Sequence, residues 1–378
     1  MNILFFAVRN HHFNYFSRLA HHANQHGLYQ AKVLHHKQSW KNVTKGIHHP
    51  DLPGIVNLKL RELSQNSEDY QLSAWDKLTK PLWMTWWSQF LFAAYQRTLI
   101  NEQPDCLITW SGMMWHQQIM ATAAEVLGIP VIYMENGPLP ATTTVDAKGV
   151  NFNNSLSREL SFYQRIDITE QQALPDGLIP RAPHKNKRAE MDEQSSLPDS
   201  YVFVPFQVDA DRQILCFSPW VSNMRELFSI LETALAALPD SMSIVVKEHP
   251  SCPKDFSDLH QKNPRICFAN QHNTQSLIEN ASAVATINSS VGLEAMLLNK
   301  PVIVLGDAFY NLEGLVYQAP NQEQLNQLFS HPGTLEASVD SKQYLSYLYH
   351  HYLIQGSWKE SSETHMDAMN NRIVELLK

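Results

Sequence analysis

The sequence predicts an α/β protein made of two Rossmann-like domains, and three observations support this class. Short apolar runs alternate with stretches that carry apolar residues at helical spacing, as in a parallel, doubly wound sheet. The pattern occurs twice, and a charged segment poor in apolar residues, Ile179–Ser200, separates the two series. At 378 residues the chain can form two domains with proper cores. We therefore expect two α/β domains that face a cleft.

The first series contains four predicted strands, at 2–8, 31–34, 105–109 and 130–134. Predicted helices lie at 14–25 and 117–127, whereas 51–70 is polar and is expected to be irregular. Glu135 follows the fourth strand directly and opens a long polar stretch, Met134–Asn154, which is expected to be a loop. Ligands of open α/β sheets bind at such carboxyl ends, so Glu135 is a candidate acid or base, or simply a charged strand end.

The second series has predicted strands at 201–205, 243–247 and 283–287 and predicted helices at 223–238, 276–279 and 291–298. A further helix is expected at 364–377. The predicted organisation is a first domain at 1–178, a linker or excursion at 179–200, a second domain at 201–345, and a helical segment at 346–378 that could pack back on the first domain.

Composition and charge narrow the function classes. A hydrophobic share of 44% and a charged share of 17% fit a soluble globular protein, and a net charge of −8 does not suggest a nucleic-acid partner. The four cysteines form no CxxC pair, which favours reduced thiols in a cytoplasmic protein. The N-terminal run lacks a basic leader and a cleavage site, so it is interpreted as a strand and not as a signal peptide.

Two unusual features have a structural and a functional interpretation. In Leu82–Ile100, Trp83, Trp86 and Trp87 share one helical face, which predicts a core-facing helix or, alternatively, a helix that contacts lipid headgroups. The segment is too polar for a confident transmembrane span. Five adjacent pairs occur among the 18 histidines, but no metal-binding spacing does, which favours solvated or hydrogen-bonded imidazoles.

The stretch Ala283–Tyr310 predicts a strand, a serine-rich turn and a helix. Asn288, Ser289 and Ser290 would present hydroxyls and backbone N–H groups at the start of the helix, where phosphate binds well. Glu294 follows about one turn later and could reach a ribose. An ordinary capped helix explains the same residues.

Two more segments follow predicted strands. Gln207, Asp209 and Asp211 lie in one loop, where the aspartates could bind Mg²⁺ or Mn²⁺, act as nucleophile or base, or form a solvated turn. In the other segment, Lys247 and His249 could contact a phosphate, and Pro250 restricts the exit of the loop. The sequence contains no GxGxxG fingerprint, P-loop, GxSxG elbow or kinase motif.

The order of these segments resembles the capsular-polysaccharide biosynthesis family of bacterial β-Kdo glycosyltransferases, of the KpsS and KpsC type. The resemblance is strong from about Tyr201 to Gln318 and weaker over Asp105–Leu156. The matching motifs are E-x-G at 135–137 with G-V-N at 149–151, Q-V-x-x-D-x-Q-I at 207–214, K-x-H-P at 247–250, T-I-N-S-S at 286–290, and N-K-P-V with G-x-A-x-Y and G-L-x-Y-Q over 299–318.

The resemblance implies a GT-B-like pair of domains with CMP-Kdo as the donor substrate, no cofactor and no metal. The cytidine nucleotide would lie on the second domain, in a site with Gln207, Pro250 and Asn288. The phosphate would be held by four side chains: Lys247, His249, Ser289 and Ser290. Glu294 would reach the ribose.

The family retains the β configuration, which implies double displacement by a carboxylate. The motif places the recurrent acid at Asp211, the expected nucleophile, with Asp209 as second choice and Glu135 as acid/base partner. The expected partners are a lipid-linked or glycan acceptor, the inner face of the cytoplasmic membrane and other capsule-assembly proteins. Two alternatives remain: a CMP-sialic-acid-type transferase with the same nucleotide site, and a non-catalytic assembly subunit of a capsule export complex.

Overall fold

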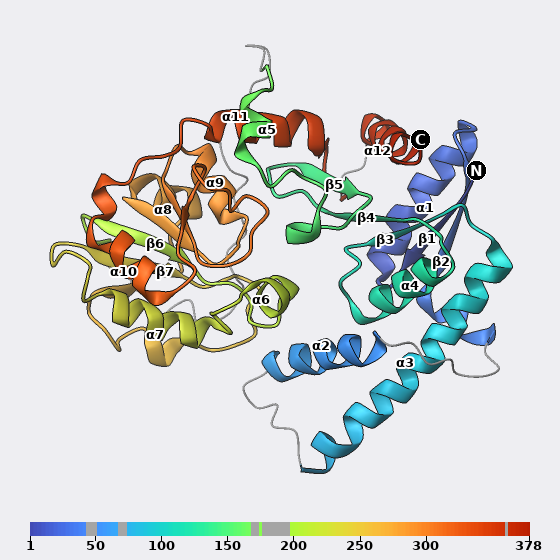
Figure 1. Cartoon of the computed structure of the whole chain (residues 1–378), viewed down its shortest axis with the longest axis horizontal. Helices are drawn as coiled ribbons and strands as arrows, with labels where there is room; N and C mark the ends of the chain where they lie inside the picture. The colour runs from blue at the N-terminus through green and yellow to red at the C-terminus, as the bar shows by residue number, and fades with distance from the viewer. Residues whose placement is uncertain (43–50, 67–73, 168–173, 176–196, 360–361) are drawn as a thin grey trace. The chain divides into compact units, whose positions relative to one another are not determined.

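The computed structural model describes residues 1–42, 51–66, 74–167, 174–175, 197–359 and 362–378. The chain divides into two compact units (Figure 1). The first comprises Met1–Ser64, Gln71–Ser155 and Tyr352–Lys378, and the second comprises Gln65–Tyr70 and Leu156–His351. Each unit contains one six-stranded sheet with helices, so the predicted α/β class with two Rossmann-like domains is confirmed. Most of the predicted linker at 179–200 lies outside the described residues.

The sheet of the first unit has the strand order β12-β5-β4-β3-β1-β2. Four strands are mutually parallel: β1 (Asn2–Ala7), β2 (Gln30–His35), β3 (Cys106–Trp110) and β4 (Val131–Asn136). Beyond β4 the sheet continues with β5 (Thr142–Asp146), which pairs antiparallel with β4, and then with β12 (Ile354–Gln355), which pairs antiparallel with β5. The expectation of one long loop over 134–154 is therefore wrong, because β5 returns along β4 as a buried strand.

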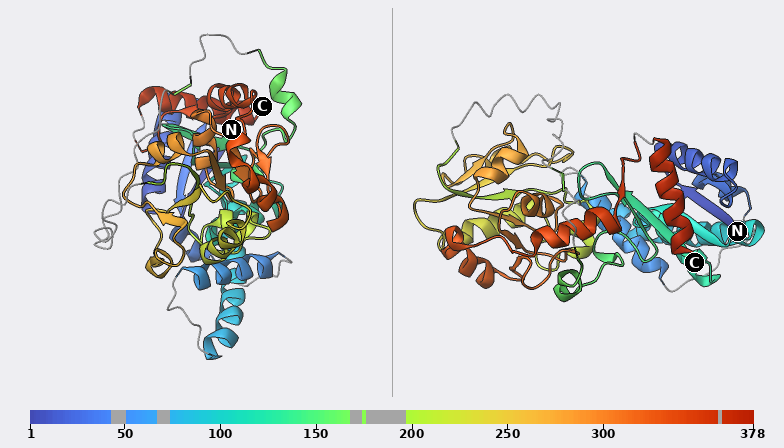
Figure 2. Two further views of the ribbon diagram at one scale, coloured as in Figure 1. Left: turned by 90° about the vertical axis from the view of Figure 1, so that its left-hand side faces the viewer. Right: turned by 90° about the horizontal axis from the view of Figure 1, so that it is seen from above.

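Helices cover both faces of this sheet. Ile3 and Phe5 of β1 face one core with α1 (Asn10–Gln25) and α12 (Glu363–Leu376), whereas Leu4 and Phe6 face a second core with α3 (Ala74–Glu102) and α4 (Trp115–Val126). This alternation is the period-2 pattern of a strand that is buried on both faces. Figure 2 shows α12 beside α1, although the two helices lie at opposite ends of the sequence.

Two expectations for the first unit need correction. The stretch expected to be irregular, 51–70, contains α2 (Leu52–Gln65), whose buried residues Leu52, Ile55 and Val56 recur at helical spacing among polar neighbours. In α3 only part of the aromatic face meets the core. Trp83 and Trp86 are 56% and 60% exposed, whereas Trp87 packs against the buried cluster. No helix among the described residues is long and apolar enough to cross a membrane.

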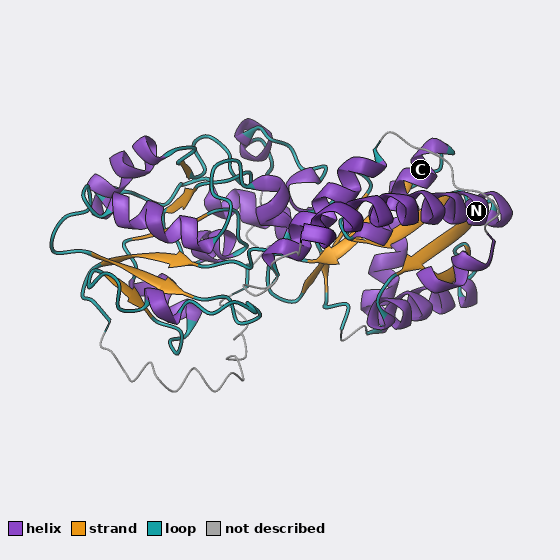
Figure 3. Ribbon diagram, turned by 90° about the horizontal axis from the view of Figure 1, so that it is seen from below, coloured by secondary structure: helices purple, strands orange, loops and turns teal. Residues whose placement is uncertain are grey.

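The sheet of the second unit is parallel, with the order β11-β10-β9-β6-β7-β8. Its strands are β6 (Tyr201–Pro205), β7 (Ser243–Lys247), β8 (Ile266–Phe268), β9 (Ala283–Thr286), β10 (Val302–Val304) and β11 (Tyr317–Gln318). Its helices are α5 (Leu160–Gln164), α6 (Arg212–Phe217), α7 (Met224–Ala234), α8 (Thr274–Asn280), α9 (Val291–Leu297), α10 (Gln322–Ser330) and α11 (Ser341–Tyr347). Figure 3 shows these strands between layers of helices.

The strand order of the second unit creates a switch point between β6 and β9. From β6 the chain proceeds to β7 and β8 on one side, then returns to β9 and continues to β10 and β11 on the other. The connections that follow β6 and β9 therefore lead to opposite sides of the sheet, and open α/β sheets bind their ligands at the carboxyl edge of such a point. The first unit has the equivalent point between β1 and β3.

Candidate active site

Two of the predicted site residues join the loops at the switch point of the second unit. Gln207 follows β6 and Asn288 follows β9, and both are buried. The Gln207 Nε2 donates to Asn288 Oδ1 at 2.9 Å, and the Asn288 amide nitrogen donates in turn to the carbonyl oxygens of Gln213 and Phe217 at 3.0 Å. Since both amides are engaged with protein, their role in this structure is to join the loops that follow β6 and β9.

The two aspartates after β6 have different environments, although their spacing in the sequence made them equivalent. Asp209 is 2% exposed, and its carboxylate accepts hydrogen bonds from Lys254 Nζ and from the backbone N–H of Met224, both at 2.7 Å. Asp211 is exposed and caps α6, where its Oδ1 accepts the N–H of Gln213 at 2.8 Å. Of the two aspartates, Asp211 is the more exposed residue.

The surroundings of Asp211 also affect its proton affinity. Desolvation by the surrounding protein raises the pKa of its carboxyl above the ordinary value, while the Gln213 N–H and the Arg212 guanidinium act in the opposite direction. The residue as a whole is nevertheless in contact with solvent, which moderates the desolvation. A carboxylate that is partly stripped of water is a stronger nucleophile than a fully hydrated one.

The segment after β7 is held in place by hydrogen bonds to the segment that follows β8. Lys247 Nζ donates to the carbonyl oxygens of Asn270, at 2.8 Å, and His272. The carboxylate of Glu248 accepts from His260 at 2.7 Å and from Asn270 at 3.1 Å. These contacts fix the loop that carries the half-buried residues His249 and Pro250 at the edge of the sheet, so Lys247 stabilises this loop whatever else it binds.

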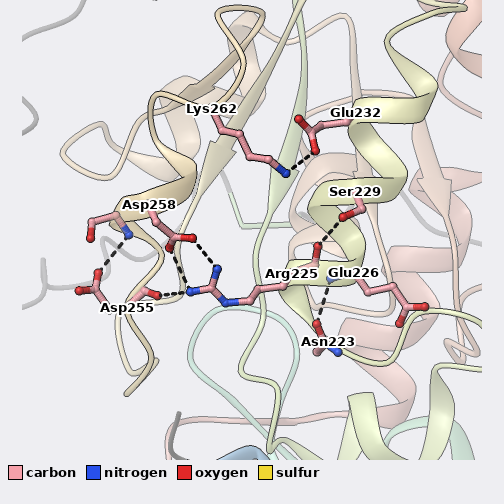
Figure 4. A network of polar contacts seen from close by, with 9 residues as sticks. Asn223, Arg225, Glu226, Ser229, Glu232, Asp255, Asp258 and Lys262 are labelled. Carbon is pink, nitrogen blue, oxygen red and sulfur yellow. Dashed lines mark hydrogen bonds and ion pairs between the residues drawn. The ribbon is translucent and has the colours of Figure 1, made fainter. Parts of the chain in front are cut away.

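Further contacts attach this loop to α7 (Figure 4). Arg225 on α7 forms a forked contact with Asp258, its two nitrogens donating at 2.7 and 3.0 Å, and it also reaches the carbonyl oxygen of Asp255 at 3.0 Å. The Arg225 guanidinium holds the pKa of Asp258 below its usual range. About two turns further along the same face of α7, Glu232 pairs with Lys262 at 2.8 Å.

The serine turn after β9 is built as the sequence predicted, with a different cap. Ser290 occupies the N-cap of α9 but its side chain makes no capping bond, whereas Ser289 Oγ accepts the N–H of Val291 at 3.2 Å. Glu294 is buried one turn into α9 and its charge contributes to raising the pKa of Tyr310, after the main effect of burial. Burial of Glu294 leaves little of its side chain accessible to a ligand.

Glu135 lies in the first unit, at the end of β4. Its Oε1 accepts three hydrogen bonds, from Trp110 Nε1 at 3.1 Å and from the backbone and side-chain nitrogens of Asn136 at 2.8 and 2.9 Å. Three N–H donors on one oxygen stabilise the ionised carboxylate.

The sequence reasoning missed the aromatic side chains around Glu135. His12 stacks on Trp110 with ring centroids 4.3 Å apart, and Trp358 packs against Trp110 at 5.0 Å while donating to Asn136 Oδ1 at 2.6 Å. Trp110 is the last residue of a buried strand, a position that could have identified it. No signal in the sequence links Trp358 to this place, because only the fold brings it there.

Of the solvated or hydrogen-bonded imidazoles that the sequence favours, several are buried, and His22 Nδ1 lies 3.1 Å from the side-chain nitrogen of Asn370. His12, His22 and His36 have little solvent contact, and burial lowers the pKa of His12 to about 3 and of His36 to about 4. The pair His48-His49 lies outside the described residues. In the part of the chain that the structure describes, no three His, Cys, Asp or Glu side chains are grouped so that they could hold a metal ion.

Comparison with solved structures identifies the fold. The chain is similar along its whole length to the β-Kdo 2,7 transferase of KpsC from Thermosulfurimonas dismutans, with a TM-score of 0.52 and 14% identity, and covers 100% of both chains. At this identity the likeness concerns the fold, which is the α/β arrangement of two Rossmann-like units found in GT-B glycosyltransferases.

Sequence relatives identify the family. The protein FixF of Sinorhizobium fredii is 35% identical over 254 residues, which are 67% of this chain and 61% of FixF. The capsule polysaccharide export protein KpsS of Escherichia coli is 29% identical over 133 residues, which are 33% of this chain and 34% of KpsS. The chain thus spans about three fifths of the first relative and one third of the second. Residues 163–358 match the model of the family described as capsule polysaccharide biosynthesis protein, and the chain belongs to this family.

Proposed function

We propose that this protein is a glycosyltransferase of capsule or surface polysaccharide synthesis that transfers Kdo from CMP-Kdo to a glycan or glycolipid acceptor. The observation that carries the proposal is the convergence of three family motifs at one sheet edge. The segments that begin at Gln207, Lys247 and Asn288 all leave the carboxyl ends of β6, β7 and β9, around the switch point. Family membership and the likeness to a β-Kdo transferase support the same reaction class.

In this proposal the nucleotide of the donor occupies the second unit. The phosphate lies at the turn that carries Ser289 and Ser290, facing the loop of Lys247 and His249. The family resemblance implies a ribose contact at Glu294, which only the small accessible part of this side chain could make. The buried positions of Gln207 and Asn288 suit residues that shape the site, since their amides already bond to protein. Lys247, also bonded to two carbonyl oxygens, would act mainly by its positive charge.

The proposed chemistry is a double displacement with retention. The Asp211 carboxylate attacks the anomeric carbon of Kdo, the bond to the phosphate oxygen breaks, and CMP leaves with the bonding electron pair. An acceptor hydroxyl then displaces the carboxylate and gives up its proton to a base. Asp211 suits the first role because it is accessible, whereas Asp209 is enclosed and ion-paired. Glu135 suits the second because its hydrogen bonds favour the ionised form.

Release of CMP from CMP-Kdo tests this function. We expect turnover in the wild type that persists in EDTA, because no step requires a metal, and loss of turnover in Asp211→Ala with the fold intact. Turnover in Asp211→Ala equal to wild type would remove Asp211 from its role. Competition between CMP-Kdo and CMP-sialic acid distinguishes the two donor classes. A protein whose melting temperature does not change in millimolar CMP would instead fit a non-catalytic assembly subunit.

The acceptor side of the proposal includes the membrane surface. In α3 the side chains of Trp75, Leu82, Trp83 and Trp86 are 56–76% exposed, and indole rings favour the headgroup region of a bilayer. We propose that this aromatic face touches the inner surface of the cytoplasmic membrane, where a lipid-linked acceptor is presented. Cosedimentation with anionic vesicles tests it: Trp83→Ala with Trp86→Ala should reduce binding without changing the melting temperature. Equal binding by this variant and the wild type would contradict it.

A further inference from the structure

A buried ion pair joins the two loops that carry the proposed chemistry. Lys254 Nζ lies 2.7 Å from Asp209 Oδ2, and the two side chains are 12% and 2% exposed. Asp209 comes two residues before Asp211, and Lys254 comes five residues after His249. The pair therefore connects the loop after β6 directly to the loop after β7.

The N-terminus of α7 completes this connection. The backbone N–H of Met224 donates to the other oxygen of Asp209 at 2.7 Å, and the neighbouring Arg225 holds the segment that follows Lys254 through Asp255 and Asp258. Each oxygen of Asp209 thus has its own donor. The carboxylate is placed by α7 on one side and by Lys254 on the other (the Arg225 contacts are drawn in Figure 4).

A contribution to the stability of the fold is by itself a weak explanation for the presence of this ion pair. Taking two charges out of water costs free energy that their attraction only partly offsets, and an apolar pair of similar volume often serves a fold equally well. What an ion pair with a fixed geometry provides is precise placement of the groups attached to it. Here these groups are the loop of the proposed nucleophile and the loop of the proposed phosphate contacts.

We propose that Lys254, paired with Asp209, is a positioning residue for glycosyl transfer: it fixes the Asp211 loop relative to the loop of His249 and so sets the distance between the attacking carboxylate and the leaving phosphate. The proposal rests on the function proposed above. It assigns Asp209 a positioning role, in place of its role as second-choice nucleophile.

Separate measurements of turnover and nucleotide affinity test this role. Misplacement of a reacting group by about 1 Å can cost ~10²-fold in rate, so Lys254→Met should lower kcat for CMP release by ~10- to 100-fold. The dissociation constant for CMP should stay within about threefold of wild type, because the nucleotide contacts remain. Lys254→Arg, which can restore the ion pair, should recover most of the turnover.

Two further variants guard against a simple folding defect. Asp209→Asn combined with Lys254→Met removes both charges, so no unpaired charge stays buried, and it should show the same loss of turnover as Lys254→Met alone. Lys262→Met is the matched control. It breaks a lysine–carboxylate pair that joins the segment after β7 to helix α7, is more exposed and does not involve Asp209 (Figure 4), and it should keep wild-type turnover.

Amide hydrogen exchange provides a readout that needs no activity. The Asp211 N–H donates to the Val208 carbonyl and the Cys252 N–H donates to the His249 carbonyl, so one amide reports on each loop. Lys254→Met should exchange faster than Lys262→Met at both amides. Unchanged exchange in both loops, or a loss of CMP affinity as large as the loss of turnover, would overturn the proposal. If the wild type transfers no Kdo, the proposed function fails, and the exchange data alone decide whether Lys254 positions the two loops.

Discussion

Lowering the pH from 7 to 5 should strongly destabilise the first unit, because three of its histidines are held neutral. Burial lowers the pKa of His12 and of His116 to about 3 and that of His36 to about 4, with the charges of neighbouring groups adding to the effect. In the unfolded chain each imidazole would titrate near 6.5. Between these values the unfolded state binds a proton that the folded state does not, so the free energy of unfolding falls as the pH falls.

The size of the effect follows from this difference. At pH 5 an unfolded imidazole holds nearly a full proton and the folded one almost none, which amounts to about 2 kcal/mol for each histidine relative to pH 7. His12 and His36 are 4% and 8% exposed, and His116 keeps somewhat more solvent contact. We therefore expect a total loss of about 5–6 kcal/mol, a large share of the ~5–15 kcal/mol that stabilises a typical domain.

Urea unfolding followed by tryptophan fluorescence measures this loss. Of the nine tryptophans, all except Trp220 fall within the ranges of the first unit, so the signal reports mainly on that unit. His116→Asn is the matched control, since an amide can keep a hydrogen bond to Tyr95 without titrating. It should reduce the pH dependence by about 2 kcal/mol. A free energy of unfolding that differs by less than 1 kcal/mol between pH 7 and pH 5 would refute the reasoning.

Three further predictions concern single side chains. Asp146→Asn should lower the free energy of unfolding by ~2–4 kcal/mol. The buried carboxylate accepts five hydrogen bonds, and an amide nitrogen cannot replace an acceptor oxygen. A loss below ~1 kcal/mol would be inconsistent with this explanation. Gly292→Ala should cost ~1–3 kcal/mol in chemical denaturation, since its Cβ would lie 2.5 Å from the Tyr310 hydroxyl; equal stability would show that the ring moves freely. Glu135→Gln should slow transfer to acceptor by ~10²–10⁴-fold in a radiolabel assay while the adduct on Asp211 still forms. Unchanged transfer would exclude Glu135 as the base.

The regular alternation of strands and helices was predictable, because its signal is the spacing of apolar residues. The buried strand β1 and the amphipathic helix α7 both follow the expected periods. Strand β5 was missed because Thr142, Thr143 and Thr144 are polar residues that are nevertheless buried, and β-branched threonine suits a strand. Helix α2 was missed because only Leu52, Ile55 and Val56 of its apolar residues are buried, and the polar and charged residues between the others obscure the spacing.

The candidate site was predictable only as a set of loops. Because each motif follows a strand, the sequence places Asp209, Asp211 and Lys247 at one sheet edge, and the structure does the same. The family resemblance ranked Asp211 ahead of Asp209, but no local pattern could show that Asp209 is enclosed, since this depends on Lys254, which lies 45 residues away along the chain. The aromatic neighbours of Glu135 depend on tertiary contacts in the same way, so no local pattern could identify Trp358.

Intact-mass analysis of the protein after incubation with CMP-Kdo, without acceptor, tests the central claim most directly. The account predicts a mass increase of one Kdo residue, located on Asp211 by peptide mapping and absent in Asp211→Ala, with release of one CMP for each adduct. Lys254→Met should form the same adduct more slowly. The account would be contradicted if CMP were released without formation of an adduct and if the product formed in the presence of acceptor had the inverted configuration.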